Sequence, residues 1–375
     1  MSGHRYVDTP QALAEVVAAF RAEPLVAADT EAASFHRYVD RVYLIQLSTR
    51  RATTIIDPLA VHELAPVGTL LADPNVEKVF HDADYDLRIL DRDYGFRAQH
   101  LFDTRIAAQL LGEPSFGLAA LLEKYAGIKL AKTHQRADWS QRPLPPAMLA
   151  YAADDTRHLP ALRDALRDRL QSLGRLAWAE EEFARHESLR WSGPDKAIDP
   201  YLRIKGAKAL PPRQLAALRE LVAWRESLAA QHDTALFRII GNEALLAVSR
   251  ALPRSLTALG AIRELPAGLA RRHGPALVAA VGQALALRED ALPKRERGQR
   301  IARDPDFDAR VERLKAVRNE VAQRLGLDPG VLCGKSTLEV IAQARPKETA
   351  GLASVGELRQ WQVGVLGDSL LAALG

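Results

Sequence analysis

The first half of the chain contains short apolar runs separated by polar, helix-forming segments. Four runs rich in aliphatic and β-branched residues predict β-strands, at residues 25–31, 42–47, 53–56 and 78–80. Helices are expected before the first of these runs and after the fourth. Strands that come first and then alternate with helices predict an α/β sheet.

Capping residues mark where these helices are expected to begin. Thr9 stands before a proline, which is favoured at the first helical position, and predicts a helix that runs to residue 20. Asp82 or Asp84 is expected to cap a helix that ends near residue 90. Asp103 and Ser115 are expected to cap two further helices. Paired prolines at 145 and 146 predict another helix start, which places residues 151–155 on a helix.

Strand signals stop near residue 196. Residues 214–230 and 242–251 carry apolar side chains at helical spacing. Segment 191–195 contains glycine and proline and predicts a domain boundary, and the charged segment 293–300 predicts a second linker. The sequence therefore predicts three domains, at residues 1–195, 207–290 and 300–375.

The two helical domains are predicted to be copies of one unit. Residues of the same type recur at a constant offset of 93 positions. The matching pairs are Leu221 and Leu314, Arg225 and Arg318, Leu245 and Leu338, Pro253 and Pro346, Leu259 and Leu352, Gly274 and Gly367, and Leu277 and Leu370. Leucine matches are common in a leucine-rich region, so the matching proline and glycine positions carry this prediction.

The composition is that of an ordinary globular protein, with 47% hydrophobic and 26% charged residues in 375. The first residues lack the apolar run of a secretory signal, and no stretch has the length of a transmembrane span. We therefore expect a cytoplasmic protein without a membrane partner. Cys333 is the single cysteine, which excludes an intramolecular disulfide and a cysteine-built zinc site.

Charge divides the chain unequally. Residues 1–195 hold 23 Lys and Arg against 28 Asp and Glu, a net charge of −5. Residues 196–375 hold 28 against 19, a net charge of +9. An acidic half beside a basic half suits a metal site joined to a phosphate-binding module. Charge runs are also common on solvated surfaces, so the division supports this interpretation without deciding it.

Two acidic residues end the first predicted strand. Asp29 and Glu31 are two positions apart, so both side chains project from one face of that strand. The preceding residues are apolar, and adjacent carboxylates at the end of a buried strand repel each other unless a cation joins them. A strand end that already lies in solvent would explain the same pair as ordinary surface acids. This pair taken alone favours the surface interpretation.

Two further acidic motifs follow along the chain. Asp86 lies one turn inside the helix that begins near Asp82 or Asp84, where no capping residue is needed. Tyr151 and Asp155 are four positions apart on a later helix and therefore share a face. Taken one at a time, each of these motifs is common in proteins for structural reasons.

Taken in order, the three motifs form a far more specific pattern. The sequence D-x-E, then a strand-to-helix Asp, then Y-x-x-x-D resembles the tyrosine branch of the DEDD exonuclease superfamily. Within it, the whole chain resembles bacterial ribonuclease D, with supporting segments at residues 44–47, 101–104 and 137–144. The helical copies resemble HRDC domains. The resemblance implies an RNase H-like α/β domain with a mixed sheet, followed by two all-α HRDC-like domains.

The resemblance also implies roles for the site residues. The four carboxylates would hold two divalent ions, Mg²⁺ or Mn²⁺, roughly 4 Å apart astride the scissile phosphate. Tyr151 would orient or deprotonate the attacking water. These metal-binding residues are Asp29, Glu31, Asp86 and Asp155.

Residues near the acids are weaker candidates for substrate contacts. They are Ser34, Phe35, His36, Tyr38 and Arg142. Phe35 or Tyr38 would stack on a base, and Arg142 would position a phosphate. A loop with incidental aromatic residues explains the first four equally well. Many ribonuclease D chains place an aromatic residue directly after the D-T-E triplet, whereas Glu31 is followed by two alanines, so contact with the terminal base is expected to differ here.

The predicted function is that of a 3′→5′ exoribonuclease. The resemblance implies hydrolysis of RNA with a free 3′ end, with transfer-RNA precursors as substrate, by a monomer that needs no protein partner. A 3′→5′ DNA exonuclease would use the same acids, and a non-catalytic RNA-binding scaffold would keep the same fold. HRDC-like domains argue against the first alternative, and the complete set of acids with Tyr151 argues against the second. HRDC-like units in some proteins bind protein partners instead of nucleic acid.

Overall fold

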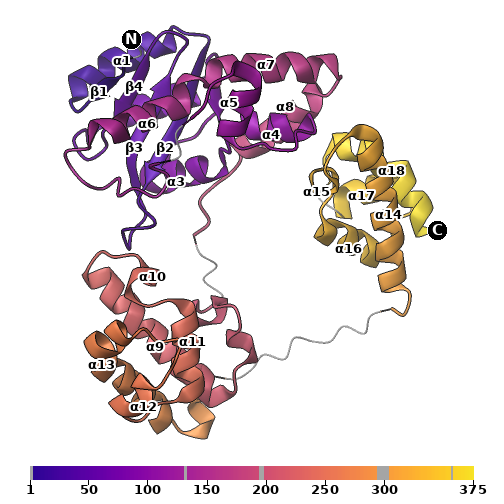
Figure 1. Cartoon of the computed structure of the whole chain (residues 1–375). Helices are drawn as coiled ribbons and strands as arrows, with labels where there is room; N and C mark the ends of the chain where they lie inside the picture. Colours follow the sequence, from indigo (N-terminus) through magenta and orange to yellow (C-terminus); the bar gives the residue numbers. More distant parts are fainter. Residues whose placement is uncertain (1–2, 131–132, 194–197, 294–303, 356–357) are drawn as a thin grey trace. The chain divides into compact units, whose positions relative to one another are not determined.

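The structure is a computed structural model that describes residues 3–130, 133–193, 198–293, 304–355 and 358–375 (Figure 1). Contacts divide the chain into two compact units. The first contains Met1–Ala32, Val42–Trp191 and Ala302–Gly375, and the second contains Ala33–Arg41 and Ser192–Ile301. Among the described residues, every helix is too short or too polar to span a membrane.

A six-stranded mixed sheet is the centre of the α/β part. Its strands lie in the order β1-β4-β3-β2-β5-β6, with antiparallel pairing around β3 and parallel pairing elsewhere. Their bounds are β1 Arg5–Val7, β2 Leu25–Ala32, β3 Val42–Ser48, β4 Thr53–Ile56, β5 Glu77–Phe80 and β6 Leu101–Asp103. The four predicted strands are confirmed as β2 to β5. Strands β1 and β6 were not predicted, because three residues are too few to show a period of two.

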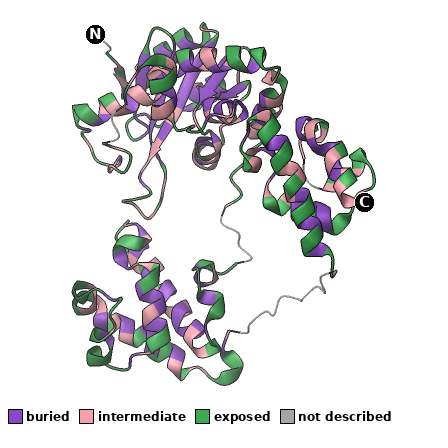
Figure 2. Ribbon diagram, turned by 45° about the vertical axis from the view of Figure 1, so that its right-hand side comes forward, coloured by how far each residue is buried: buried purple, intermediate pink, exposed green. Residues whose placement is uncertain are grey.

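Eight helices of this part surround the sheet. They are α1 Pro10–Arg21, α2 Ala65–Ala72, α3 Asp84–Tyr94, α4 Thr104–Leu110, α5 Leu118–Ala126, α6 Pro146–Arg157, α7 Leu159–Ser172 and α8 Leu176–Glu187. Figure 2 shows buried strands beneath helices whose outer faces are exposed. This arrangement buries both faces of the sheet, as its continuous apolar strands require.

Two of the predicted caps are confirmed and two are wrong. The Thr9 side chain accepts a hydrogen bond from the amide of Ala12 and caps α1, and Asp103 caps α4. Neither Asp82 nor Asp84 caps α3, and Ser115 lies too far before α5, whose first residue is Leu118. The Asp103 carboxylate caps the start of α3 instead. It accepts hydrogen bonds from the amides of Asp82 and Ala83, at 3.2 and 2.7 Å. One acid from β6 therefore fixes the starts of two helices.

The two helical repeats follow, and one of their hydrogen bonds recurs at the predicted offset. The first consists of α9 Pro212–Gln231, α10 Leu236–Ile239, α11 Asn242–Ala251, α12 Leu256–Gly260 and α13 Ala267–Ala286, flanked by three 3-10 turns at Pro200–Arg203, Ala207–Ala209 and Glu289–Ala291. The second consists of α14 Phe307–Leu325, α15 Pro329–Leu332, α16 Lys335–Ala344, α17 Thr349–Val355 and α18 Gln360–Leu374. Arg225 donates to the carbonyl of Ile240, and Arg318 donates to that of Cys333, 93 positions further on.

The two repeats have different neighbours in the structure. The second repeat belongs to the same unit as the α/β part, and Trp361 of α18 stacks on Trp178 of α8 with ring centroids 5.0 Å apart. The Trp361 indole also donates to Glu182 at 2.9 Å. Most of the predicted linker at 293–300, and residues 194–195 of the first boundary, lie outside the described residues.

Candidate active site

Strand β2 carries the first two acids to the end of the sheet. Asp29 and Glu31 lie opposite Gln46 and Leu44 of β3, and the register shifts directly after Glu31. On the other side of β2, the parallel partner β5 pairs only with Leu25–Ala27. The two acids therefore extend beyond β5 at the carboxyl end of a parallel pair, where α/β sheets place their sites.

Helix α6 brings the tyrosine and the last acid to the same place. It begins at Pro146, and its buried Ala152 and Ala153 let it pack closely on the sheet. The side chain of Thr156 lies 2.7 Å from that of Ser48 at the end of β3, which fixes the helix along its axis. Tyr151 and Asp155 consequently project from one side of α6 toward β2, as their four-residue spacing predicts.

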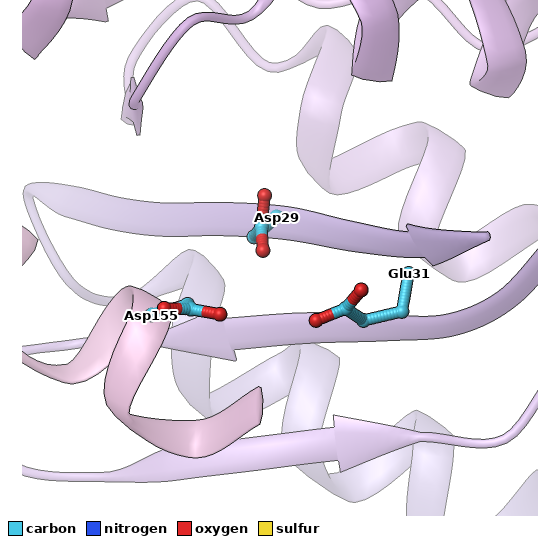
Figure 3. Close-up of side chains that lie close together, drawn as sticks. All are labelled: Asp29, Glu31 and Asp155. Carbon is cyan, nitrogen blue, oxygen red and sulfur yellow. The ribbon is translucent and has the colours of Figure 1, made fainter. Parts of the chain in front are cut away.

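The structure brings three of the four predicted acids into one cluster. Carboxylate oxygens of Asp29, Glu31 and Asp155 all lie within 4.8 Å of one another. Figure 3 shows the side chains of Glu31 and Asp155 directed toward each other beside Asp29. All three keep partial exposure to solvent. Within the described part of the chain, no lysine or arginine forms an ion pair with any of them.

Asp86, the fourth predicted acid, is buried beside this cluster. Its carboxylate accepts hydrogen bonds from the amide of Thr30, at 3.0 Å, and from the Thr30 hydroxyl. Thr30 lies between the two acids of β2, so Asp86 on α3 is tied to that strand. Its charge raises the pKa of both Asp29 and Glu31.

The electrostatics of the cluster are unfavourable for the protein alone. Burial, followed by repulsion from the neighbouring acids, raises the pKa of Asp29 and Glu31 well above their usual range. Burial raises the pKa of Asp86 and Asp155 to about 7. The pKa of Tyr151 is also raised, first by burial and then by Asp155, to which its hydroxyl is hydrogen-bonded. Crowded carboxylates of this kind favour a cation.

A residue that the sequence did not single out lies beside Tyr151. The ring of His134 approaches Tyr151 edge to face, with centroids 5.7 Å apart, and the centroid of the Trp139 ring lies 6.1 Å from that of Tyr151. A cavity of about 280 Å³ is lined by His134, Tyr151 and Asp155 together with Ala147 and neighbouring residues. No motif in the sequence marks this histidine, because its loop has no periodic pattern.

The loop predicted to contact substrate belongs to the other compact unit. The four residues concerned are Ser34, Phe35, His36 and Tyr38. They lie in Ala33–Arg41, which packs with the first helical repeat. The Tyr38 hydroxyl donates to Glu226 at 3.0 Å, and the His36 carbonyl accepts from the amide of Ala235 at 3.2 Å. The hairpin between β2 and β3 is thus held by a domain about 200 residues further along the chain.

Arg142 has a structural role in this structure. Its guanidinium pairs with both oxygens of Asp57, at 2.6 and 2.7 Å, and donates to the carbonyls of Tyr43, Trp139 and Gln141. These contacts use all five of its N–H donors. A phosphate would have to displace one of them, so the predicted phosphate contact is not supported by the geometry.

Comparison with known families matches both parts of the chain. The model of a family described as 3′-5′ exonuclease matches residues 4–171. The HRDC domain model matches twice, at residues 214–281 and 307–374. The two HRDC matches are displaced by 93 residues, the offset of the sequence repeat, which confirms that the helical domains are copies of one unit.

Whole-chain relatives and solved structures agree with this division. Ribonuclease D of Pseudomonas paraeruginosa is 32% identical over 99% of this chain and 97% of its own, and that of Escherichia coli is 35% identical over 78% and 77%. The crystal structure of Escherichia coli RNase D, described as an exoribonuclease involved in structured RNA processing, aligns with a TM-score of 0.74 and 29% identity over 99% of this chain and 98% of that one. The catalytic core of RRP6 from Trypanosoma brucei aligns with a TM-score of 0.67 and 30% identity over 76% and 81%. The chain therefore belongs to the ribonuclease D family of 3′→5′ exoribonucleases.

Proposed function

We propose that this protein hydrolyses RNA from its 3′ end with two divalent metal ions held by Asp29, Glu31, Asp86 and Asp155. The observation that carries the proposal is the cluster of three carboxylates within 4.8 Å of one another, without a cationic side chain among the described residues. When bound, the ions supply positive charge that activates the attacking water and stabilises the leaving 3′ oxygen. None of the described side chains supplies the positive charge that would neutralise the cluster.

The donor set supports a hard cation. All four side chains offer carboxylate oxygens, the ligands that Mg²⁺ and Mn²⁺ prefer, and no cysteine or histidine belongs to the cluster. The raised pKa values support the same conclusion, because carboxylates that repel one another gain most from a bound cation. Asp86 is proposed as the fourth ligand because it already contacts the strand between Asp29 and Glu31.

Tyr151 is proposed to orient the attacking water. Its hydroxyl is hydrogen-bonded to Asp155, and its raised pKa keeps the phenol protonated near neutral pH in the metal-free protein. A protonated phenol can hold a water molecule as hydrogen-bond acceptor or donor. Orientation is therefore better supported than removal of a proton, although bound cations would lower the pKa of the phenol.

The proposed substrate is RNA with a free 3′ end, with transfer-RNA precursors as the physiological class. The Escherichia coli relative, which aligns over nearly the whole chain, is described as acting in structured RNA processing. We propose that the loop with Ser34, Phe35, His36 and Tyr38 contacts the RNA, since it directly follows the two acids of β2. We further propose a cytoplasmic enzyme that acts as a monomer, with three functional parts at residues 1–195, 207–290 and 300–375.

Digestion of matched oligonucleotides tests the proposal. RNA and DNA of one sequence, each with a free or a 3′-blocked end, are incubated with Mg²⁺ or Mn²⁺ and with a chelator. We expect stepwise release of nucleoside 5′-monophosphates from free-ended RNA only, and only with metal. Preferred digestion of DNA would identify a DNA exonuclease. RNA binding without any digestion would identify a non-catalytic scaffold.

A further inference from the structure

One glutamine of the central sheet is buried without a hydrogen-bond partner for its side chain. Gln46 of β3 is fully buried, and neither its Nε2 nor its Oε1 forms a hydrogen bond with any described residue. Its neighbours along the strand, Ile45 and Leu47, are aliphatic. An unpaired buried amide costs free energy, and an aliphatic side chain would fill the same position without that cost. The packing of the sheet therefore does not explain Gln46.

The register of the sheet places Gln46 beside the first acid of the candidate site. Gln46 lies directly opposite Asp29 in the antiparallel pairing of β3 with β2. Residues directly opposite each other project from the same face, with Cβ atoms about 4.5–5.5 Å apart. Helix α6 covers this face, because Ser48, two positions further along β3, contacts Thr156 of α6 at 2.7 Å. Gln46 therefore lies on the face of the sheet that carries the proposed metal ligands.

A second buried glutamine shows how such a side chain stabilises a fold. Gln362 of α18 is also buried, and its Nε2 donates to the carbonyl of Leu332 at 2.9 Å. Its Oε1 accepts a hydrogen bond from the amide of Arg359, also at 2.9 Å. Gln362 thus uses both ends of its side-chain amide, whereas Gln46 uses neither among the described residues. Unpaired polar groups of this kind are expected at functional sites.

An ionised Asp29 would be stabilised by the donors that the Gln46 amide carries. Burial and the neighbouring acids raise the pKa of Asp29, and a hydrogen bond with the Thr30 backbone lowers it. The Gln46 amide has two N–H donors, and a hydrogen bond from either would act in the same direction as that of Thr30. Carboxylates that bind metal ions are commonly held by hydrogen bonds from residues behind them.

We propose that Gln46 is a positioning residue whose Nε2 donates to the Asp29 carboxylate when divalent ions are bound. This inference rests on the proposed function and adds to it a residue that touches neither the ions nor the RNA. The hydrogen bond would fix the carboxylate in one orientation, so Asp29 would lose less freedom when an ion binds. The cost of the buried amide in the metal-free protein would then be offset in the metal-bound one.

Gln46→Met tests the proposal, because methionine has a similar length but no N–H donor. The measurements, on the full chain, are the Tm without metal and the Kd for Mn²⁺, both by calorimetry. We expect the Kd to rise about 10-fold or more, the usual effect of losing a hydrogen bond to a metal ligand. The Tm without metal should stay the same or rise, because an unpaired buried amide is removed. Gln46→Leu, a second variant of different shape, should give the same two results.

Gln362→Met is the matched control, since it removes a buried glutamine whose amide is paired. It should lower the Tm and leave the Kd for Mn²⁺ unchanged. A lower Tm in both Gln46 variants would show that Gln46 stabilises the fold, and this result would overturn the proposal. A Kd equal to that of the wild type would overturn it as well. If the wild type binds no Mn²⁺, the proposed function itself fails, and the role of Gln46 fails with it.

Discussion

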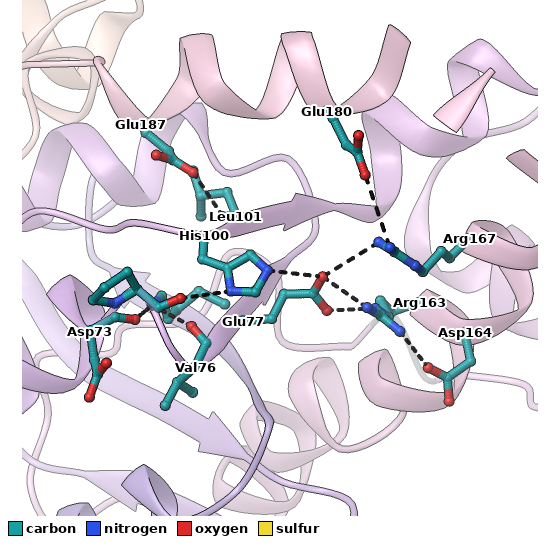
Figure 4. A network of polar contacts seen from close by, with 12 residues as sticks. Asp73, Val76, Glu77, His100, Leu101, Arg163, Asp164, Arg167, Glu180 and Glu187 are labelled. Carbon is teal, nitrogen blue, oxygen red and sulfur yellow. Dashed lines mark hydrogen bonds and ion pairs between the residues drawn. The ribbon is translucent and has the colours of Figure 1, made fainter. Parts of the chain in front are cut away.

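The central sheet contains two groups of acids whose surroundings are opposite. Glu77, at the start of β5, is 4% exposed and lies between Arg163, at 2.6 Å, Arg167, at 3.9 Å, and His100, at 3.8 Å (Figure 4). Asp29 and Glu31, near the end of the neighbouring strand β2, have no such partners among the described residues and share their space with Asp155.

The contrast separates an acid that stabilises the fold from acids that we propose bind divalent ions. Burying a carboxylate is costly unless a cation offsets the lost hydration. At Glu77 the chain supplies the cations from α7. At Asp29 and Asp155 the described residues supply further negative charge, so the proposed divalent ions would offset the cost. Burial therefore says little about function, and the sign of the neighbouring charges says much more.

The largest effect on activity should come from neutralising an acid of the unpaired group, which consists of Asp29, Glu31 and Asp155. Asp155→Asn preserves the shape of the side chain but removes an anionic ligand, so kcat/KM on RNA should fall roughly 10³-fold or more. Glu77→Gln is the matched control, since it neutralises the buried acid that is paired with Arg163 and Arg167. It should leave kcat/KM nearly unchanged. Initial rates of nucleotide release in saturating Mg²⁺ measure both. Full activity in Asp155→Asn would contradict the assignment of the site.

Removal of one hydroxyl should have a smaller effect. Tyr151→Phe keeps the ring against Trp139 and all four carboxylates, so metal affinity should persist while kcat falls about 10²-fold. Metal affinity is measured by titration and kcat by initial rates. A parallel loss of metal affinity would instead make Tyr151 a residue that supports the ligands, and an unchanged kcat would remove it from the mechanism.

The Glu77→Gln control, which should spare activity, should lower the stability of the fold. Glu77→Gln leaves Arg163, whose side chain is 18% exposed, with Asp164 as its remaining acidic partner. We expect a loss of about 2 kcal/mol in the free energy of unfolding. This corresponds to a fall in Tm of roughly 4–8 °C, measured by calorimetry. A Tm equal to that of the wild type would show that the paired group contributes nothing to the fold.

The smallest predicted effect is a pH dependence of the metal-free protein. Asp155 has a pKa of about 7 in the fold, above its ordinary value, so it disfavours folding once it is ionised. Its contribution to the free energy of unfolding is favourable below pH 4, and this contribution is lost as the pH rises to about 7. The difference in Tm between Asp155→Asn and the wild type should therefore grow over this range. A difference that shrinks as pH rises would contradict the raised pKa.

Local sequence signals predicted the strands and the order of the site residues, but not contacts made across the fold. The D-x-E and Y-x-x-x-D spacings fix a shared face, which is a property of the element itself. The cap of α3 could not be predicted, because Asp103 reaches it from another strand. Arg142 is similar, since nothing near it in the sequence marks Asp57 as its partner. The position of loop Ala33–Arg41 depends on a domain far along the chain.

The two HRDC repeats also show that the sequence did not predict contacts between distant parts of the chain. An offset of 93 predicted two copies of one fold, because positions that make the internal hydrogen bonds of each copy, such as Arg225 and Arg318, match. What each copy contacts depends on surface positions that need not match. Trp361, which stacks on Trp178, corresponds to Gly268 in the first copy. Periodicity therefore predicts the fold of a repeat but not its neighbours.

Thermal unfolding during a Mn²⁺ titration tests the central claim most directly, because it reports the cation without requiring turnover. Mn²⁺ at about 100 times its Kd should stabilise the wild type by roughly 2.7 kcal/mol, seen as a rise in Tm of several degrees. Glu77→Gln should show the same rise from its lower starting Tm. Asp155→Asn should start higher at neutral pH and show little or no rise. An equal rise in Asp155→Asn, or none in the wild type, would contradict the account that the unpaired carboxylates form the metal site.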